Sequence, residues 1–171
     1  AGCAHADGRL VNADALLLQR CSSLSADYAA INPAALEPAI APHLAAAQAG
    51  IVLRAAELAD HVRAQAASGA EALLVEGAAG WLVPLNETET MADLAVALGY
   101  PVILVVGMRL GCINHALLTA AAITAAGLQL AGWVANGVTP EMEALAENVR
   151  ALEQRLPALR LGTVPFLVGG C

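Results

Sequence analysis

Four short, strongly apolar segments alternate with segments of helical pattern, and this alternation limits the folds open to the chain. The apolar segments are residues 72–75, 101–106, 130–135 and 161–164, and the second is rich in β-branched residues. Strands without polar positions are typical of parallel sheets buried on both faces. Helices between such strands form crossover connections. We therefore expect an α/β fold, with a mainly parallel sheet and helices on both faces.

Capping and breaking residues bound the expected helices. Asn12 precedes the first helix as an N-cap would, and Gly69, Gly99 and Gly127 end later ones. The expected helices are residues 13–20, 43–49, 51–67, 88–98, 111–126 and 141–156. The length of 171 residues, without repeats or linkers, predicts a single domain, residues 1–171.

Charge and composition exclude several classes of partner. Eight basic residues, all arginine, stand against fifteen carboxylates, and the net charge is −7. This balance offers no basic surface to nucleic acid or to an anionic membrane. The apolar stretch 116–135 contains Gly127 and Gln129, so we do not expect a membrane span. Four scattered cysteines indicate neither zinc nor a disulfide framework, and we expect a cytoplasmic location.

The first expected strand leads into a carboxylate and a run of small residues. In parallel sheets ligands bind at the carboxyl ends of the strands. Glu76 at that end suits Mg²⁺, and Gly77, Ala78 and Ala79 would let a phosphate approach the backbone. The alternative is a solvated carboxylate at the start of a turn. Asp14, in the first turn of its helix, could serve only to complement the helix dipole.

The next two strands lead into a helix start and an amide. Free N–H groups at the start of the helix, around residues 111–114, could bind a carboxylate, although Asn114 could be only a cap or first-turn residue. Asn136 could recognise an adenine edge, although Asn136-Gly137 is also a turn dipeptide. His115 has no triad-like partner and is interpreted as structural. Together these residues indicate a mononucleotide enzyme that uses Mg²⁺. The usual phosphate-binding motif GxxxxGK[ST] is not in the sequence, which has no lysine.

Several strings resemble those of the dethiobiotin synthetase family. They are 12–15 (NADA), 75–81 (VEGAAGW), 101–107 (PVILVVG), 110–115 (LGCINH), 130–136 (LAGWVAN) and 162–167 (GTVPFL). The resemblance covers essentially the whole chain. It implies a three-layer P-loop NTPase-like fold and a homodimeric ligase of biotin biosynthesis. Such an enzyme forms C–N bonds to close the ureido ring of dethiobiotin from diaminopelargonate and CO₂. ATP phosphorylates a substrate carbamate, and catalysis depends on positioning and charge neutralisation.

The resemblance also implies roles for individual residues. Asp14 and Glu76 would be the magnesium-binding carboxylates, and Asn136 would recognise adenine, with Gly137 beside it. The nucleotide site would be lined by Gly77, Ala78 and Ala79, and the base would be flanked by Pro165, Phe166 and Leu167. Substrate contacts would come from Ala1, Gly111, Cys112, Ile113 and Asn114, the last four toward substrate bound to the other subunit.

Three positions depart from the family pattern. Ala1 stands where the family often has serine, Ala79 where glycine is usual, and Gly137 where an acidic residue often follows the asparagine. The family's first strands, its P-loop and its catalytic lysines would precede Ala1, and its last stretch would follow Gly170. We therefore expect no catalytic residue in this chain. The alternatives are a related P-loop amidoligase, a ParA-like ATPase, or a non-catalytic remnant that dimerises.

A polypeptide of these 171 residues alone is predicted to form negligible dethiobiotin, because it has no lysine to neutralise a transferring phosphate. The measurement is product formation with Mg-ATP, bicarbonate and diaminopelargonate. Measurable dethiobiotin would contradict the prediction.

Overall fold

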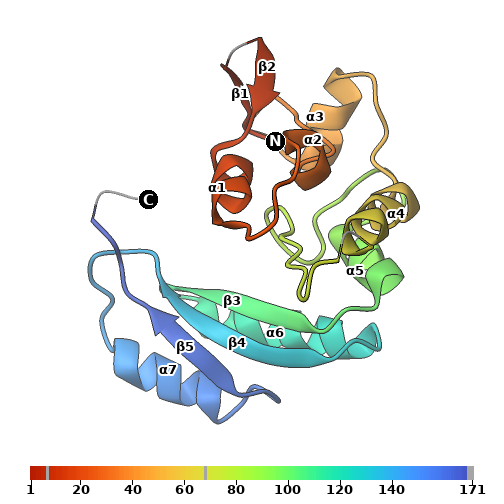
Figure 1. Ribbon diagram of the computed structural model, residues 1–171. Helices are drawn as coiled ribbons and strands as arrows, with labels where there is room; N and C mark the ends of the chain where they lie inside the picture. Colours follow the sequence, from red (N-terminus) through yellow and green to blue (C-terminus); the bar gives the residue numbers. More distant parts are fainter. Residues whose placement is uncertain (7, 68, 169–171) are drawn as a thin grey trace. The chain divides into compact units, whose positions relative to one another are not determined.

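The computed structural model describes residues 1–6, 8–67 and 69–168 (Figure 1). The chain divides into two compact units, Ala1–Leu98 and Gly99–Cys171. We describe each unit by itself. The expectation of a single domain stays a prediction.

Unit 1 consists of helices preceded by a small antiparallel hairpin of β1 (Ala4–Ala6) and β2 (Arg9–Val11). Its helices are α1 (Ala13–Cys21), α2 (Tyr28–Ile31), α3 (Pro42–Gln48), α4 (Ala55–Ala66) and α5 (Met91–Leu98). Four of the helices confirm the sequence prediction, with ends shifted by up to four residues. The hairpin and α2 were not predicted.

The core of unit 1 is built largely from small side chains. Ala45 on α3 and Ala59 on α4 are completely buried. They share an apolar cluster with Leu36, Ala46, Leu53, Ala55, Leu85 and Leu94. The loop before α5 also satisfies the start of α4, where Arg54 gives no side-chain cap. The Glu89 carboxylate accepts a hydrogen bond from the Ala55 N–H at 3.3 Å, so this loop and α4 are fixed to each other.

The strand predicted at residues 72–75 is wrong. These residues form no strand and pair with none of the strands in the described part of the chain. Leu74 is 75% exposed. An apolar run of four residues is compatible with a buried strand. A strand forms, however, only where a neighbouring strand completes its backbone hydrogen bonds. Glu76 therefore does not follow a strand here.

Unit 2 contains a parallel three-stranded sheet in the order β3-β4-β5 (Figure 1). Its strands are β3 (Val102–Met108), β4 (Leu130–Gly137) and β5 (Arg160–Val164). Helix α6 (Cys112–Ala125) connects β3 to β4, and α7 (Leu145–Glu153) connects β4 to β5. These elements confirm an α/β fold with a parallel sheet flanked by helices. The helix predicted at 141–156 is shorter than expected.

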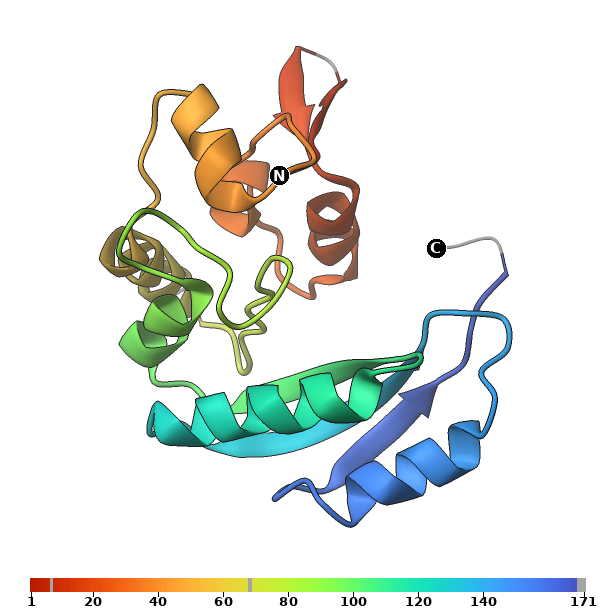
Figure 2. The same ribbon diagram turned by 180° about the vertical axis from the view of Figure 1, so that it is seen from behind.

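Helices α6 and α7 contact each other, and α6 lies over β3 and β4 (Figure 2). On α6 the buried residues Cys112, Ala116, Ala120 and Ile123 recur at helical spacing. The fully buried side chains of unit 2 include Trp133 on β4 and Leu152 on α7. Other sheet residues face out of this core: Ile103, Val105 and Leu161 are 48%, 59% and 55% exposed.

The apolar stretch considered as a membrane span divides between α6 and β4. Helix α6 ends at Ala125, and β4 begins at Leu130. Across the residues that the structure describes, no helix has both the length and the apolar character needed to cross a membrane.

The start of α5 predicts a small pH dependence of stability. The Asp93 carboxylate accepts hydrogen bonds from Thr90 N at 2.6 Å and Thr90 Oγ1 at 2.8 Å. These bonds, the backbone one most, lower the pKa of Asp93. A lowered pKa stabilises the fold above the unfolded-state pKa of about 3.9, and this stabilisation is lost as the pH falls through the folded-state value.

We expect the free energy of unfolding to fall less steeply for Asp93→Asn than for the wild type as the pH drops from about 6 to about 3. Urea unfolding across this range measures both slopes. Equal slopes would show that the Asp93 hydrogen bonds do not contribute to stability.

Candidate functional site

The residues that follow the three strands of unit 2 gather at one edge of the sheet. Because the strands are parallel, Asn136 of β4 is in register with Gly107 of β3 and Val164 of β5. The start of α6, the end of β4 and the segment after β5 therefore meet at the carboxyl edge. This is the edge where α/β sheets bind ligands. Asn136 is partly exposed there.

Gly137 is in unusually close contact with the segment after β5. A Cβ atom at position 137 would lie 2.7 Å from the backbone nitrogen of Phe166 and 3.2 Å from the carbonyl carbon of Pro165. The structure thus brings together four of the residues expected around the base, Asn136, Gly137, Pro165 and Phe166, and Leu167 follows Phe166 in the chain. Phe166 is 37% exposed, which leaves part of its ring free to contact a ligand. The sequence marked Gly137 as a departure from the family, but could not show that a side chain would collide with this backbone.

The start of α6 is shaped by Gly111, whose φ of +93° is in the left-handed region. The Cys112 N–H donates to Arg109 O at 3.0 Å, and the Cys112 side chain is buried. Cys112 is therefore not available to a ligand. Ile113 and Asn114 follow in the first turn, and Asn114 is exposed. Helix α6 has 14 residues, long enough for its first turn to favour an anion.

In unit 1 the exposed Asp14 lies in the first turn of α1. Asn12 is the N-cap, and its Oδ1 accepts hydrogen bonds from Asp14 N at 2.9 Å and Ala15 N at 3.3 Å. The Asn12 Nδ2 donates to Ala1 O at 3.4 Å. One asparagine therefore links two predicted site residues, Ala1 and Asp14.

Glu76 and the three residues after it lie in an exposed, irregular segment. A Cβ at Gly77 would lie 3.0 Å from the Met91 side chain. Ala79 has a φ of +64°, which favours glycine, and costs an alanine about 1–2 kcal/mol. The family preference for glycine at this position thus matches the backbone that the chain adopts.

The carboxylates of Asp14 and Glu76 are better suited to Mg²⁺ than to a metal ion whose ligands all come from protein side chains. No group of three or more His, Cys, Asp or Glu residues in the described ranges could enclose a metal ion. Mg²⁺ commonly binds through one or two carboxylates and completes its shell with water and phosphate oxygens. The oxygen ligands of Asp14 and Glu76, both exposed, fit that pattern.

A family model described as an AAA domain matches residues 3–168. The chain is 57% identical to the ATP-dependent dethiobiotin synthetase BioD of Pseudomonas paraeruginosa, over 97% of this chain and 73% of the relative. It is 54% identical to the protein of the same name from Cellvibrio japonicus, over 98% and 73% of the two chains. The corresponding protein of Xanthomonas euvesicatoria is 50% identical, over 98% of this chain and 75% of its own length.

The close approach at Gly137 predicts that Gly137→Ala will destabilise unit 2. The added methyl group must displace backbone, and overpacking of this kind costs about 1–3 kcal/mol. Gly162→Ala is the matched control, because Gly162 lies on β5 with open space around its Cβ position. Thermal unfolding should show a lower Tm for Gly137→Ala than for Gly162→Ala. Equal Tm values would contradict the tight contact.

Proposed function

Because the chain belongs to the dethiobiotin synthetase family, we propose that it functions in an enzyme that closes the ureido ring of dethiobiotin from diaminopelargonate and CO₂, using ATP and Mg²⁺. An ATP-dependent ligase of biotin biosynthesis is the function common to the relatives named above. The observation that carries the proposal is the gathering of the α6 start, Asn136 and Phe166 at the carboxyl edge of one parallel sheet. This arrangement would provide an anion site and a base site at the same edge of the sheet.

Within unit 2, the proposed contacts are those to the nucleotide base. The Asn136 amide would supply a donor and an acceptor to the adenine edge. Pro165, Phe166 and Leu167 would flank the ring, in a position that depends on the absence of a side chain at Gly137. In unit 1, Gly77, Ala78 and Ala79 would border the phosphates, since their small side chains leave the backbone accessible.

Asp14 and Glu76 would hold Mg²⁺, which when bound would neutralise negative charge on the phosphates. Both carboxylates are exposed, so they can reach the ion directly or through water. The Asn12 cap fixes the backbone that carries Asp14, because Asp14 N–H donates to Asn12 Oδ1. Preorganisation of this kind lowers the cost of positioning a charged ligand.

The start of α6 would hold the distal carboxylate of the substrate. Cys112 N–H is already bonded to Arg109, so Ile113 and Asn114 would provide the backbone donors. The substrate held there would belong to the other subunit of a homodimer. The enzyme would work in the cytoplasm, with a phosphorylated carbamate as intermediate and displacement of phosphate by the second amine. The phosphate-neutralising lysines would not come from these 171 residues.

The test uses a chimera in which this chain replaces the segment that it matches in the Pseudomonas paraeruginosa relative. We expect labelled bicarbonate to enter dethiobiotin, with ADP formation that requires diaminopelargonate. Glutamine-dependent amide formation would favour an amidoligase, and DNA-stimulated hydrolysis a ParA-like ATPase. Binding of a carboxylate ligand without turnover would favour a non-catalytic role. Each of these results would overturn the proposal.

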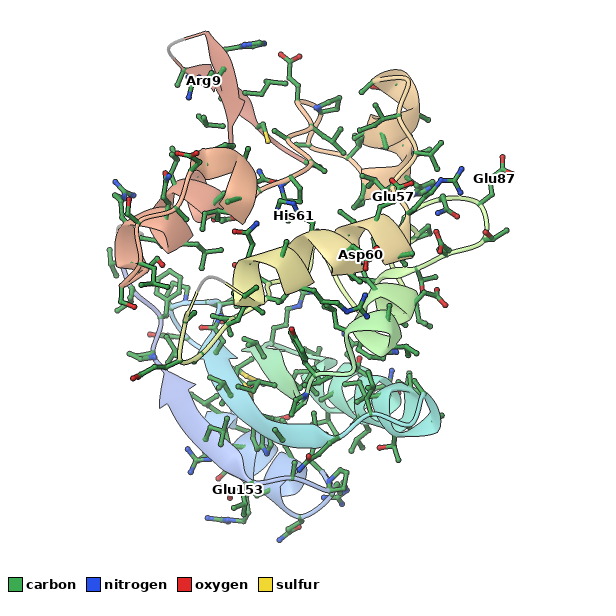
Figure 3. The ribbon with its side chains drawn as sticks, turned by 45° about the vertical axis from the view of Figure 1, so that its right-hand side comes forward. Arg9, Glu57, Asp60, His61, Glu87 and Glu153 are labelled. Atoms are coloured by element: carbon green, nitrogen blue, oxygen red, sulfur yellow. The ribbon has the colours of Figure 1, made fainter. Side chains whose placement is uncertain are left out.

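In the same chimera, Asp14→Asn and Glu76→Gln are each expected to raise the Mg²⁺ concentration at half-maximal rate by about tenfold or more, because each removes a charged ligand oxygen. Glu87→Gln is the control, since Glu87 is an exposed carboxylate that points away from its neighbours (Figure 3). The rate is measured across a Mg²⁺ titration. A metal dependence shared by all three variants and the parent would exclude the two carboxylates as ligands.

A further inference from the structure

The phenol of Tyr28 holds the backbone that carries Asp14. Its hydroxyl oxygen accepts a hydrogen bond from the backbone N–H of Asn12 at 2.8 Å. It accepts a second from the Asn32 side-chain amide at 2.9 Å. Sixteen residues separate Tyr28 from Asn12, so the contact fixes two distant parts of unit 1 to each other.

Every polar group of Asn12 takes part in a hydrogen bond. Its backbone carbonyl begins the helical ladder by accepting from Leu16 N at 3.0 Å. Its side chain caps Asp14 and Ala15 and reaches Ala1. The N–H bonded to Tyr28 is the remaining polar group of the residue. The orientation of the first turn of α1 therefore depends on where Tyr28 holds the Asn12 backbone.

Helix α2, which carries Tyr28, is also hydrogen-bonded to α4. His61 extends from α4, where it is labelled in Figure 3, and its Nε2 lies 2.8 Å from Ala30 O of α2. Asn32, which bonds the hydroxyl, is the C-cap of the same short helix. Helix α2 has only four residues and buries none of them. These polar contacts rather than apolar packing therefore position it.

We propose that Tyr28 is a positioning residue for the Asp14 carboxylate, acting through its hydrogen bond to Asn12. This inference rests on the proposed function, in which Asp14 holds Mg²⁺. Tyr28 touches neither metal nor substrate in this scheme. Loss of its hydroxyl would leave the ring in place but free the Asn12 N–H, so the first turn of α1 would sample more orientations and Asp14 would meet the metal less often.

The test is Tyr28→Phe in the chimera described above. With excess ATP, thermal stabilisation by Mg²⁺ gives the half-saturating metal concentration without reference to turnover. We expect it to rise about threefold to tenfold, the effect of one hydrogen bond. Amide hydrogen exchange in the metal-free protein should become faster at Asn12, Asp14 and Ala15. Tyr100→Phe is the matched control, because Tyr28 is the tyrosine whose hydroxyl forms hydrogen bonds among the described residues.

A double variant separates positioning from general destabilisation. If Tyr28 acts through Asp14, Tyr28→Phe should have little further effect on half-saturation in an Asp14→Asn background. Equal effects in both backgrounds would overturn the inference, as would a lower Tm for Tyr28→Phe with unchanged half-saturation. If Asp14→Asn alone leaves half-saturation unchanged, the proposed metal role itself fails, and the inference fails with it. If Asp14→Asn weakens Mg²⁺ binding but Tyr28→Phe does not, only the inference is overturned.

Discussion

Strand β4 forms parallel ladders along both of its edges, with β3 on one side and β5 on the other. Parallel neighbours can be joined only by long crossovers, which here are α6 and α7. Trp133 on β4 is completely buried, as is Leu152 on α7. This pairing along both edges of β4 fixes the register of the three strands, so their carboxyl ends lie at the same edge of the sheet. The proposed base and anion sites therefore depend on it.

Apolar patterning predicted the strands of unit 2 correctly, because each of these segments pairs with a neighbouring strand that completes its hydrogen bonds. The same patterning failed at residues 72–75, which pair with no strand in the described ranges. The hairpin of β1 and β2 was missed although Asp7-Gly8 is a typical hairpin dipeptide. Asp7 lies outside the described residues. Three-residue strands of Ala, His, Arg, Leu and Val are too short for periodicity to reveal them.

For the candidate site, strand-end reasoning placed Asn136 and the start of α6 at the same sheet edge, since parallel register follows from connectivity. It could not find Tyr28, because a contact between a tyrosine hydroxyl and a backbone N–H sixteen residues away leaves no periodic signal. Nor could it explain Gly137, whose need for a bare Cα comes from the backbone of Phe166. Sequence patterns do not reveal contacts between segments that lie far apart in the sequence.

We have proposed a separate role for each unit: in unit 1 Asp14 and Glu76 hold Mg²⁺, and in unit 2 Asn136 contacts the adenine base. The most direct measurement is a crystal structure of the full-length chimera with Mg-ATP. We expect Mg²⁺ bound to both carboxylates, directly or through one water, and an adenine edge within hydrogen-bond distance of the Asn136 amide. A metal held by neither carboxylate, or a base bound away from Asn136, would contradict it.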